Sequence, residues 1–75
     1  MITFEIFKKP EGNQNHPLII RTTIPRSLGG NGWDVDRYLP QEDYSLFAGL
    51  AMRAGEKKAI PRALAGERVS WRTAV

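Results

Sequence analysis

The chain has 75 residues and no cysteine; 41% of the residues are hydrophobic and 25% are charged. This length predicts one small domain of ordinary globular composition, and the missing thiols exclude disulfides, thiolate metal sites and cysteine nucleophiles. The net charge of +3 is unevenly spread, with six basic and two acidic residues from Arg53 onward against five and six before it. A positive C-terminal third favours an anionic partner, either nucleic acid or an acidic protein surface.

Two segments near the N-terminus have the period-two alternation of β-strands. Residues 2–8 and 18–25 are rich in β-branched and aromatic side chains, which predicts a strand in each. The polar loop between them, residues 9–17, favours an antiparallel hairpin. Pro25 ends the second strand because proline has no N–H to donate.

Residues 26–39 are the least regular part of the chain, and we expect a long loop there that includes the glycine-rich segment 29–32. Loops of this length in a small domain are often functional, or mobile until a partner binds. Trp33 and Tyr38 flank its acidic part. We expect Tyr38 to fold into the core, whereas Trp33 is equally consistent with the core and with a contact to a partner.

The second half of the chain predicts one main helix and a further strand. The apolar spacing predicts a helix over about 41–54, with Pro40 before it and Gly55 as the C-terminal cap. Alternatively, Asp43 is the N-cap and the helix starts at Tyr44. Pro61 rules out a long second helix but permits one short helical turn before Gly66. Residues 67–73 alternate again and predict the third strand.

The predicted fold is therefore a single α+β domain over residues 1–75, a three-stranded antiparallel sheet packed on one helix. The strands are 2–8, 18–25 and 67–73, and the long loops are 9–17 and 26–39. The expected core is apolar and drawn from all these elements: Phe4, Ile6, Leu18, Ile20, Ile24, Leu46, Phe47, Leu50, Ala51, Val69 and Trp71.

Signatures of an enzyme or a metal site are sparse. His16 is the single histidine and lies in a polar loop, where a solvated surface role is the ordinary one. Asn31, Asp34 and Asp36 bring three oxygen ligands together, but their spacing does not match an EF-hand calcium loop. The glycines at 29–32 lack the Lys-Ser/Thr of a phosphate-binding loop. We therefore expect no catalytic activity, no metal and no cofactor.

Residues 20–28, Ile-Arg-Thr-Thr-Ile-Pro-Arg-Ser-Leu, resemble the DNA-reading strand of ribbon-helix-helix repressors. Residues 51–55 and 62–65 resemble the helix, turn and second helix of that family. About a dozen residues separate the strand from the helix here, and Pro61 stands where the family's second helix continues. The resemblance implies a small dimeric repressor whose base-reading residues are Arg21 and Thr23.

The leading prediction is a small non-enzymatic regulatory or inhibitory protein, of the kind that phages and mobile elements encode. It is expected to dock on an acidic surface of a protein or nucleoprotein complex that handles nucleic acid. The alternative is direct DNA or RNA binding by the basic C-terminal third. The partner- or nucleic-acid-binding residues predicted for these functions are Lys57, Lys58, Arg62, Arg68, Arg72 and Trp33.

Two further expectations concern assembly and location. Apolar side chains such as Phe7 and Ile19 fall on the outer face of the predicted sheet, which is consistent with a homodimer or with docking on a partner. A cytoplasmic location is expected, since the first residues have the wrong charge order for a signal peptide and no apolar run reaches about 18 residues.

Overall fold

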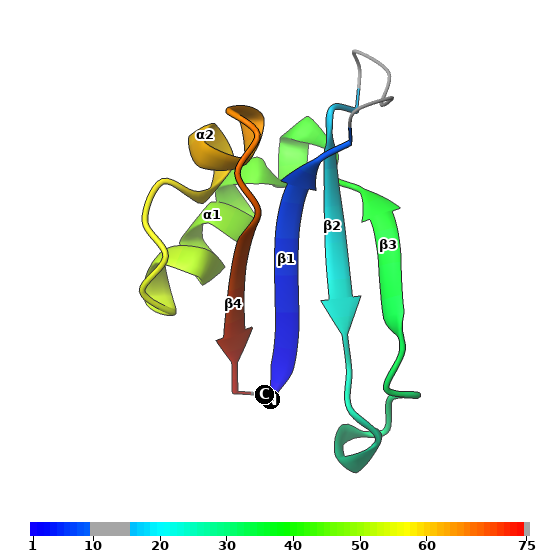
Figure 1. Cartoon of the computed structure of the whole chain (residues 1–75). Helices are drawn as coiled ribbons and strands as arrows, with labels where there is room; N and C mark the ends of the chain where they lie inside the picture. The colour runs from blue at the N-terminus through cyan, green and yellow to red at the C-terminus, as the bar shows by residue number, and fades with distance from the viewer. Residues whose placement is uncertain (10–15, 75) are drawn as a thin grey trace.

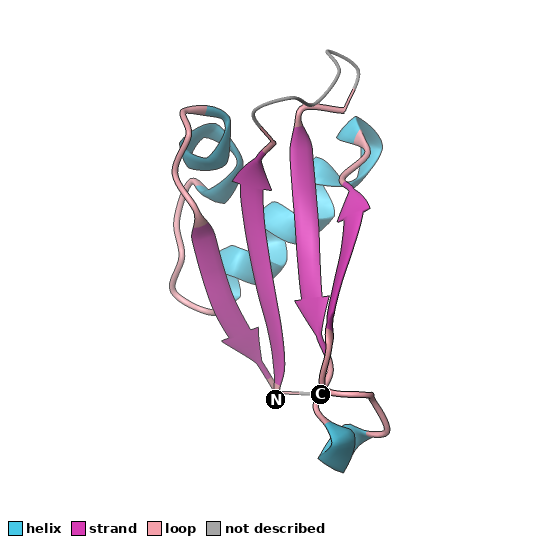
Figure 2. Cartoon of the chain, turned by 45° about the vertical axis from the view of Figure 1, so that its right-hand side comes forward, coloured by secondary structure: helices cyan, strands magenta, loops and turns pink. Residues whose placement is uncertain are grey.

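The computed structural model describes residues 1–9 and 16–74, which form a four-stranded antiparallel sheet with helices on one face (Figures 1 and 2). The sheet order is β3-β2-β1-β4, so β3 and β4 are the two edge strands. The strands, in chain order, are β1 (Ile2–Lys8), β2 (Leu18–Thr23), β3 (Asp34–Tyr38) and β4 (Val69–Thr73).

The α+β class, the antiparallel sheet and the single main helix are confirmed, but the prediction of three strands is wrong. The additional strand is β3, which lies inside the segment that was expected to be a loop. Its pairing with β2 aligns Thr23 with Asp34 and Ile19 with Tyr38. β3 is exposed along its whole length and contains two aspartates, so it lacks the apolar composition of a typical strand; an edge strand can be hydrated on both faces.

The first two strands pair as the sequence predicts, from Thr3 opposite Thr23 to Lys8 opposite Leu18. β2 ends at Thr23, two residues before Pro25. Of the loop predicted between the strands, residues 10–15 lie outside the described part of the chain. β1 also pairs with β4, with Phe4 opposite Trp71, so β1 is an inner strand of the sheet.

The glycine-rich segment is a tight hydrogen-bonded turn between β2 and β3. A short 3-10 helix (Arg26–Leu28) opens it. The N–H of Gly30 donates to the carbonyl of Pro25 at 3.1 Å, and the N–H of Gly32 donates to the carbonyl of Ile24 at 3.0 Å. A Cβ at Gly30 would overlap the carbonyl oxygen of Ile24, so this close approach of two backbone segments requires glycine.

The main helix, α1 (Tyr44–Arg53), begins after a 3-10 turn (Gln41–Asp43). Asp43 is the N-cap residue, as in the second of the two predicted starts. At the other end Gly55 has a φ of 93°, and the N–H of Glu56 donates to the carbonyl of Ala51 at 2.8 Å. This is the Schellman arrangement, in which a glycine in the left-handed region ends the helix.

A second helix, α2 (Ala59–Leu64), is one residue longer than the turn predicted after Pro61 and starts before it. Proline is tolerated there because an N–H in the first helical turn has no intrahelical acceptor. Gly66, with a φ of 101°, repeats the Schellman arrangement: the N–H of Glu67 donates to the carbonyl of Arg62 at 3.1 Å. The chain then enters β4.

The core lies between the helices and the face of the sheet formed by β1, β2 and β4. Most of the predicted core side chains are buried or half-buried there, but Ile24 and Leu46 are 37% and 58% exposed, and Tyr38 is 45% exposed; those three predictions are wrong. Five buried residues were not predicted, and three of them belong to α2: Ile19, Leu39, Ala59, Ile60 and Ala63. Ile19 was expected on an exposed outer face of the sheet, but it is 7% exposed.

Candidate functional site

The helices leave the β3 side of the sheet uncovered. α2 packs against β1 and β4, and α1 packs against β4 and α2. All five residues of β3 are exposed, and Figure 1 shows this strand at the edge farthest from α2. The strand therefore offers its backbone and both of its faces to a partner.

The outward backbone groups of β3 follow from its register with β2. The N–H of Leu39 donates to the carbonyl of Leu18 at 2.9 Å. Hydrogen-bonded and non-hydrogen-bonded pairs alternate in an antiparallel ladder, so the backbone groups of Val35 and Arg37 also face β2. Those of Asp34, Asp36 and Tyr38 face away from the sheet. In the sheet that residues 1–9 and 16–74 form, the outer edge of β3 is thus an unpaired row of donors and acceptors.

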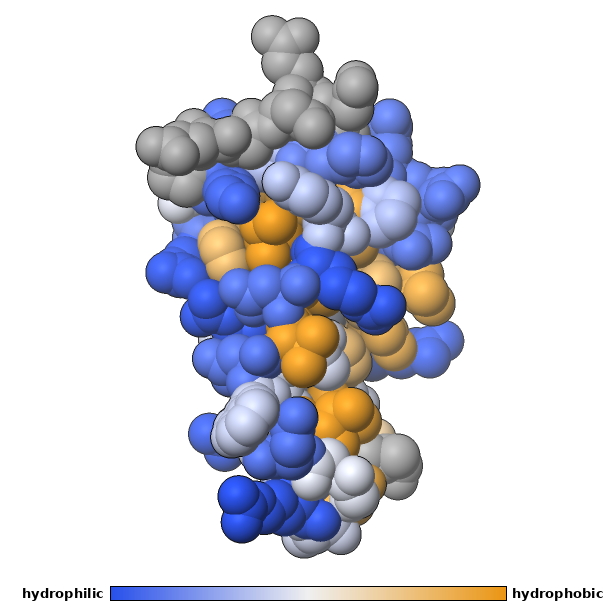
Figure 3. All heavy atoms as spheres, turned by 90° about the vertical axis from the view of Figure 1, so that its right-hand side faces the viewer, coloured by the Kyte–Doolittle hydropathy of each residue, from blue (hydrophilic) through white to orange (hydrophobic). Residues whose placement is uncertain are grey.

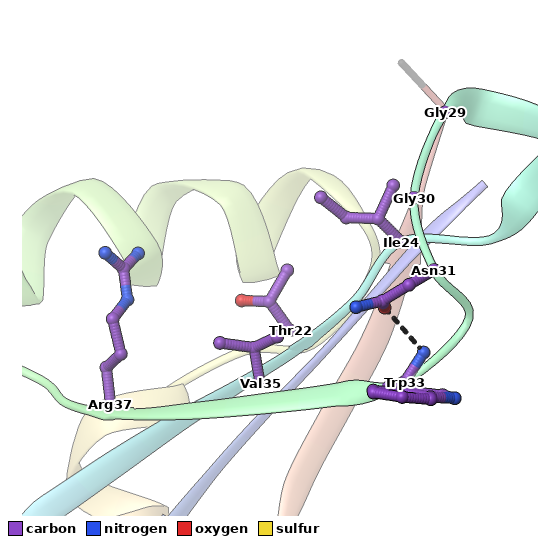
Figure 4. Close-up of a pocket in the computed structure, with 8 residues that line it drawn as sticks. All are labelled: Thr22, Ile24, Gly29, Gly30, Asn31, Trp33, Val35 and Arg37. Carbon is purple, nitrogen blue, oxygen red and sulfur yellow. Dashed lines mark hydrogen bonds between the residues drawn. The ribbon is translucent and has the colours of Figure 1, made fainter.

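A groove of about 520 Å³ runs along the helix-side face of β3 and the turn before it. Figure 4 shows Thr22, Val35 and Arg37 projecting to the same side of β2 and β3, with Trp33 at one end. Trp33 is 70% exposed and Val35 is 50% exposed. The lining combines strand side chains with the glycine turn: Thr22, Ile24, Gly29, Gly30, Asn31, Trp33, Val35 and Arg37.

The turn holds Trp33 at this place. The side-chain carbonyl of Asn31 accepts a hydrogen bond of 2.9 Å from the N–H of Trp33 (Figure 4), which is a local turn typical of asparagine. Together with the bonds made by Gly30 and Gly32, this contact sets the direction in which the chain enters β3. Of the two alternatives for Trp33, the structure shows the exposed one.

Arg37 stands at the other end of the groove and also borders a second hollow of about 220 Å³ between β3 and α1. Leu46 and Phe47 line that hollow from the helix. Arg37 makes no ion pair with any described residue. Figure 3, which views the molecule from the β3 side, shows apolar patches separated by hydrophilic side chains along this surface. The groove therefore combines apolar side chains with a cation that makes no ion pair in the described part of the chain.

The opposite face of β3 carries charges that are already paired. Arg21 donates to both carboxylate oxygens of Asp36, at 2.8 and 3.1 Å. The hydroxyl of Thr23 donates to Asp34 at 2.6 Å, and Glu5 lies 3.7 Å from Arg21. The hydrogen bond from Arg21 lowers the pKa of Asp36, and the same bond raises the pKa of Arg21.

The six predicted site residues do not form one patch. Lys57 and Lys58 lie in the connection between α1 and α2, at the β4 side of the molecule. Trp33 lies at the opposite edge, beside β3. Arg68 and Arg72 alternate with the buried Val69 and Trp71, so they project from the face of the sheet that has no helices. Five of the six residues therefore fall into three separate groups: Lys57 with Lys58, Trp33 alone, and Arg68 with Arg72.

Arg62 is occupied by contacts within the chain. It donates to both carboxylate oxygens of Glu67, at 2.9 and 2.7 Å, to Glu56 at 3.2 Å and to the carbonyl of Lys57 at 2.8 Å. The hydrogen bonds from Arg62 lower the pKa of Glu67, and those bonds raise the pKa of Arg62. Arg62 thus links both ends of α2 and is not a free cation.

Arg68 is also engaged, whereas Arg72 is not. The guanidinium of Arg68 lies 3.3 Å from Glu5 and 4.2 Å from the centre of the Phe7 ring. Arg72 makes no ion pair with a described residue. Phe7 is half-buried, and Ile19 is 7% exposed. The outer face of the sheet is therefore a mixed surface of interleaved acidic, basic and aromatic groups.

The minor candidates from the sequence have local structural contacts. The ring of His16 lies 5.4 Å from that of Tyr38. The side chains of Asn31, Asp34 and Asp36 accept hydrogen bonds from the N–H of Trp33, from Thr23 and from Arg21. Within residues 1–9 and 16–74, no three histidine, aspartate or glutamate residues cluster as metal ligands would.

β2, which resembles the strand of ribbon-helix-helix repressors, is paired on both sides within the chain, with β1 and with β3. A strand with both edges occupied cannot pair with the same strand of a second copy. Arg21 projects to the face without helices, where it is bonded to Asp36. The dimer implied by the resemblance is therefore not available to β2.

Trp33 was predicted as a binding residue, but Val35 and Arg37 were not, because the segment that contains them was expected to be a loop. One signal was present: from residue 33 to 38 the positions alternate between Trp33, Val35 and Arg37 on one side and the two aspartates and Tyr38 on the other. Cross-strand pairing of Arg21 with Asp36 could not be seen without the register.

No protein-family model matches the chain, and no curated protein or solved structure is significantly similar to it. Among the described residues, neither helix has the length and apolar character that a bilayer crossing requires. The features of the molecule that point to a function are therefore the geometry of β3 and its groove.

Proposed function

We propose that this protein is a small non-enzymatic regulatory or inhibitory module that docks on a partner protein by accepting an extended segment along β3. The observation that carries the proposal is the unpaired outer edge of β3, formed by Asp34, Asp36 and Tyr38, beside the groove at Trp33. In strand addition, main-chain hydrogen bonds provide affinity and a neighbouring groove provides specificity.

The exposed aromatic residue supports a partner over a merely solvated edge. Proteins usually protect edge strands with charge, bulges or covering loops, and the two aspartates of β3 give partial protection on one face. On the other face Trp33 and Val35 are at least half exposed next to an apolar groove. Tryptophan is enriched among residues that dominate binding energy.

The partner class follows from the remaining charge. Lys57, Lys58 and Arg72 make no ion pair with described residues, and they would attract an acidic protein or a nucleoprotein complex over a longer range. Such charges raise the association rate more than the affinity. In this proposal the strand edge provides the specific contact, and the basic residues accelerate the encounter.

The test selects peptides on the immobilised protein from a random twelve-residue display library and then titrates them against the labelled protein. We expect selected peptides to shift the backbone amide resonances of β3 and the preceding turn. The W33A substitution should weaken peptide binding. D36P is compared with D36A: both lack the carboxylate, but only D36P lacks the outward N–H. Proline is tolerated on an edge strand whose N–H faces solvent.

Strand addition predicts that D36P loses binding relative to D36A while both variants keep the circular dichroism of the folded protein. Should D36P disturb the fold, a synthetic chain with N-methylalanine at position 36 makes the same comparison against D36A. Selected peptides that leave β3 unshifted, or that bind both members of the pair equally, would overturn the proposal.

Direct nucleic-acid binding remains the alternative, and Arg68 and Arg72 on one face of β4 are the observation in its favour. Glu5, Asp34 and Asp36 share that face, and these carboxylates would repel phosphates. A labelled single strand and a duplex are titrated at two salt concentrations with the wild type and the R68A/R72A variant. Tight binding whose salt dependence weakens in the variant would favour this alternative over the protein partner.

A further inference from the structure

The two sides of β3 present different chemistry to an incoming strand. Val35 and Arg37 project into the groove on the helix side, whereas Asp34 and Asp36 project to the face without helices. Residues directly opposite one another in paired strands share a face and interact there. Alternate side chains of a bound segment would therefore contact Val35 and Arg37 on one face of the sheet and Asp34 and Asp36 on the other.

On the face without helices, the two aspartates of β3 share one arginine of the neighbouring strand β2. Glu5, Asp34 and Asp36 surround Arg21, and Arg68 adds a second guanidinium near Glu5. Arg21 lies 2.8 Å from Asp36 but 3.8 Å from Asp34, whose side chain is 55% exposed. Each aspartate keeps acceptor capacity beyond its bond to Arg21 or Thr23, so a basic side chain of the partner could bind both at the outer edge of the sheet.

In the groove the charge has the opposite sign. Arg37 has no carboxylate partner among the described residues, and it borders both the groove and the hollow next to α1. Val35, Ile24 and Trp33 provide the apolar contact further along. An acidic side chain opposite Arg37 and an apolar one opposite Val35 would satisfy both.

The backbone register strengthens these side-chain contacts. Since the backbone groups of Val35 and Arg37 face β2, these two residues form non-hydrogen-bonded pairs with an incoming antiparallel strand. Such pairs bring the opposite Cα atoms to about 4.5 Å and their side chains closest together. Asp34 and Asp36 would form the hydrogen-bonded pairs. The sheet is antiparallel throughout, so its twist suits a further antiparallel strand.

We infer that β3 binds a segment of a different protein that runs antiparallel and carries an acidic, a basic, an apolar and a basic residue in consecutive order. In this register the acidic residue faces Arg37, the first basic residue faces Asp36 and the apolar residue faces Val35. The second basic residue faces Asp34. The inference depends on the proposed function, because it specifies the segment that strand addition accepts.

A second copy of β3 is a poor occupant for the same reason. Two-fold pairing of β3 with itself places like charges opposite one another in every central register. If the two-fold axis passes through the pair of Val35 residues, Asp34 of each copy lies opposite Asp36 of the other. If the axis passes through the pair of Asp36 residues or the pair of Arg37 residues, that residue lies opposite its own copy. Like charges in directly opposed positions destabilise a strand pair, so the edge discriminates against self-association.

The residues that lead into β4 have a partly similar order, Glu67, Arg68 and Val69, but a folded copy does not expose it. Val69 is 1% exposed, and both carboxylate oxygens of Glu67 are bonded to Arg62 at 2.7 and 2.9 Å. Pairing of β3 with β4 of another copy would also be head-to-tail, which gives a ring or an open filament instead of a two-fold dimer. The occupant is therefore a segment from another protein.

The experiment uses three capped synthetic peptides: TTERVKTT, its reversed sequence, and TTKEVETT, in which the charges are exchanged. They are titrated against the full chain and against R37E, with R53E as a control that makes the same charge change on α1, away from β3. Arg37 and Arg53 are both exposed, so neither change is expected to affect folding. Amide chemical shifts report affinity and the residues contacted.

We expect the first peptide to shift the amides of β3 and to bind wild type and R53E about fivefold or more tightly than R37E. The charge-exchanged peptide should recover affinity on R37E relative to wild type. Equal binding of all three peptides at β3, or equal effects of R37E and R53E, would overturn the inferred pattern while leaving strand addition in place. Absence of β3 shifts with every peptide would overturn both.

Sedimentation should show a monomer, and a concentration-dependent dimer or filament that protects β3 would overturn the exclusion of a second copy.

Discussion

Replacing Leu39 and Leu46 by alanine separately tests the assignment of the core. Sequence periodicity placed Leu46 in the core and left Leu39 in a loop, whereas the structure has Leu39 fully buried and Leu46 58% exposed. Leu39 directly follows β3, and its N–H bonds to Leu18. Its side chain fills the space between the sheet and the helices, in the cluster that includes Ile20.

The expected effects differ by several-fold. Truncating a fully buried leucine to alanine removes its transfer free energy and leaves a cavity, so L39A should lower the free energy of unfolding by about 3 kcal/mol. L46A should change it by less than about 0.5 kcal/mol, since that side chain is mostly in water. For a domain of this size, the L39A effect corresponds to a fall in Tm of about 12–24 °C.

Urea unfolding followed by circular dichroism measures both variants under the same conditions. If L39A is too unstable to purify, L39V removes one methylene group and should still cost about 1 kcal/mol. Equal destabilisation by L39A and L46A, or a larger effect of L46A, would show that α1 packs with a different face toward the sheet. The assignment of the groove beside α1 would then be wrong as well.

Three further outcomes are expected from measurements of stability and of peptide binding. G49A should raise the free energy of unfolding by about 0.5–1 kcal/mol, because a Cβ at this helix position meets no atom within 4 Å; no gain would contradict the helix interior assigned to Gly49. G30A should destabilise the turn and weaken peptide binding in the groove, because its Cβ would overlap the carbonyl oxygen of Ile24; unchanged binding would remove the turn from the site. The hydrogen bond from Arg21 lowers the folded-state pKa of Asp36, so its stabilising contribution is complete above the unfolded value of about 4 and is lost as the pH falls below it. Acid titration of stability should therefore be less steep in D36N than in the wild type, and identical profiles would mean that the contact with Arg21 does not form in solution.

Local sequence determined the elements whose side chains alternate or recur with a clear period. β1 and β2 are predicted by their β-branched and aromatic residues. α1 is predicted by its apolar spacing and by Gly55, because glycine readily adopts the left-handed backbone conformation that ends a helix. The short second helix was also foreseeable, because Pro61 limits its length and Gly66 ends it. These are properties of a few neighbouring residues, so the chain alone specifies them.

Tertiary structure decided the fourth strand and therefore the candidate site. Asp34 and Asp36 are poor strand formers, and β3 exists because β2 supplies its backbone hydrogen bonds and Arg21 compensates its charge. Sequence patterns also could not assign the basic residues to their partners. Arg62 and Arg68 were predicted to be free cations, but the fold brings Glu5 from a distant strand against Arg68 and the carboxylates on either side of α2 against Arg62. The register between distant segments, which no local periodicity encodes, places Arg37 beside the groove, where it makes no ion pair with a described residue.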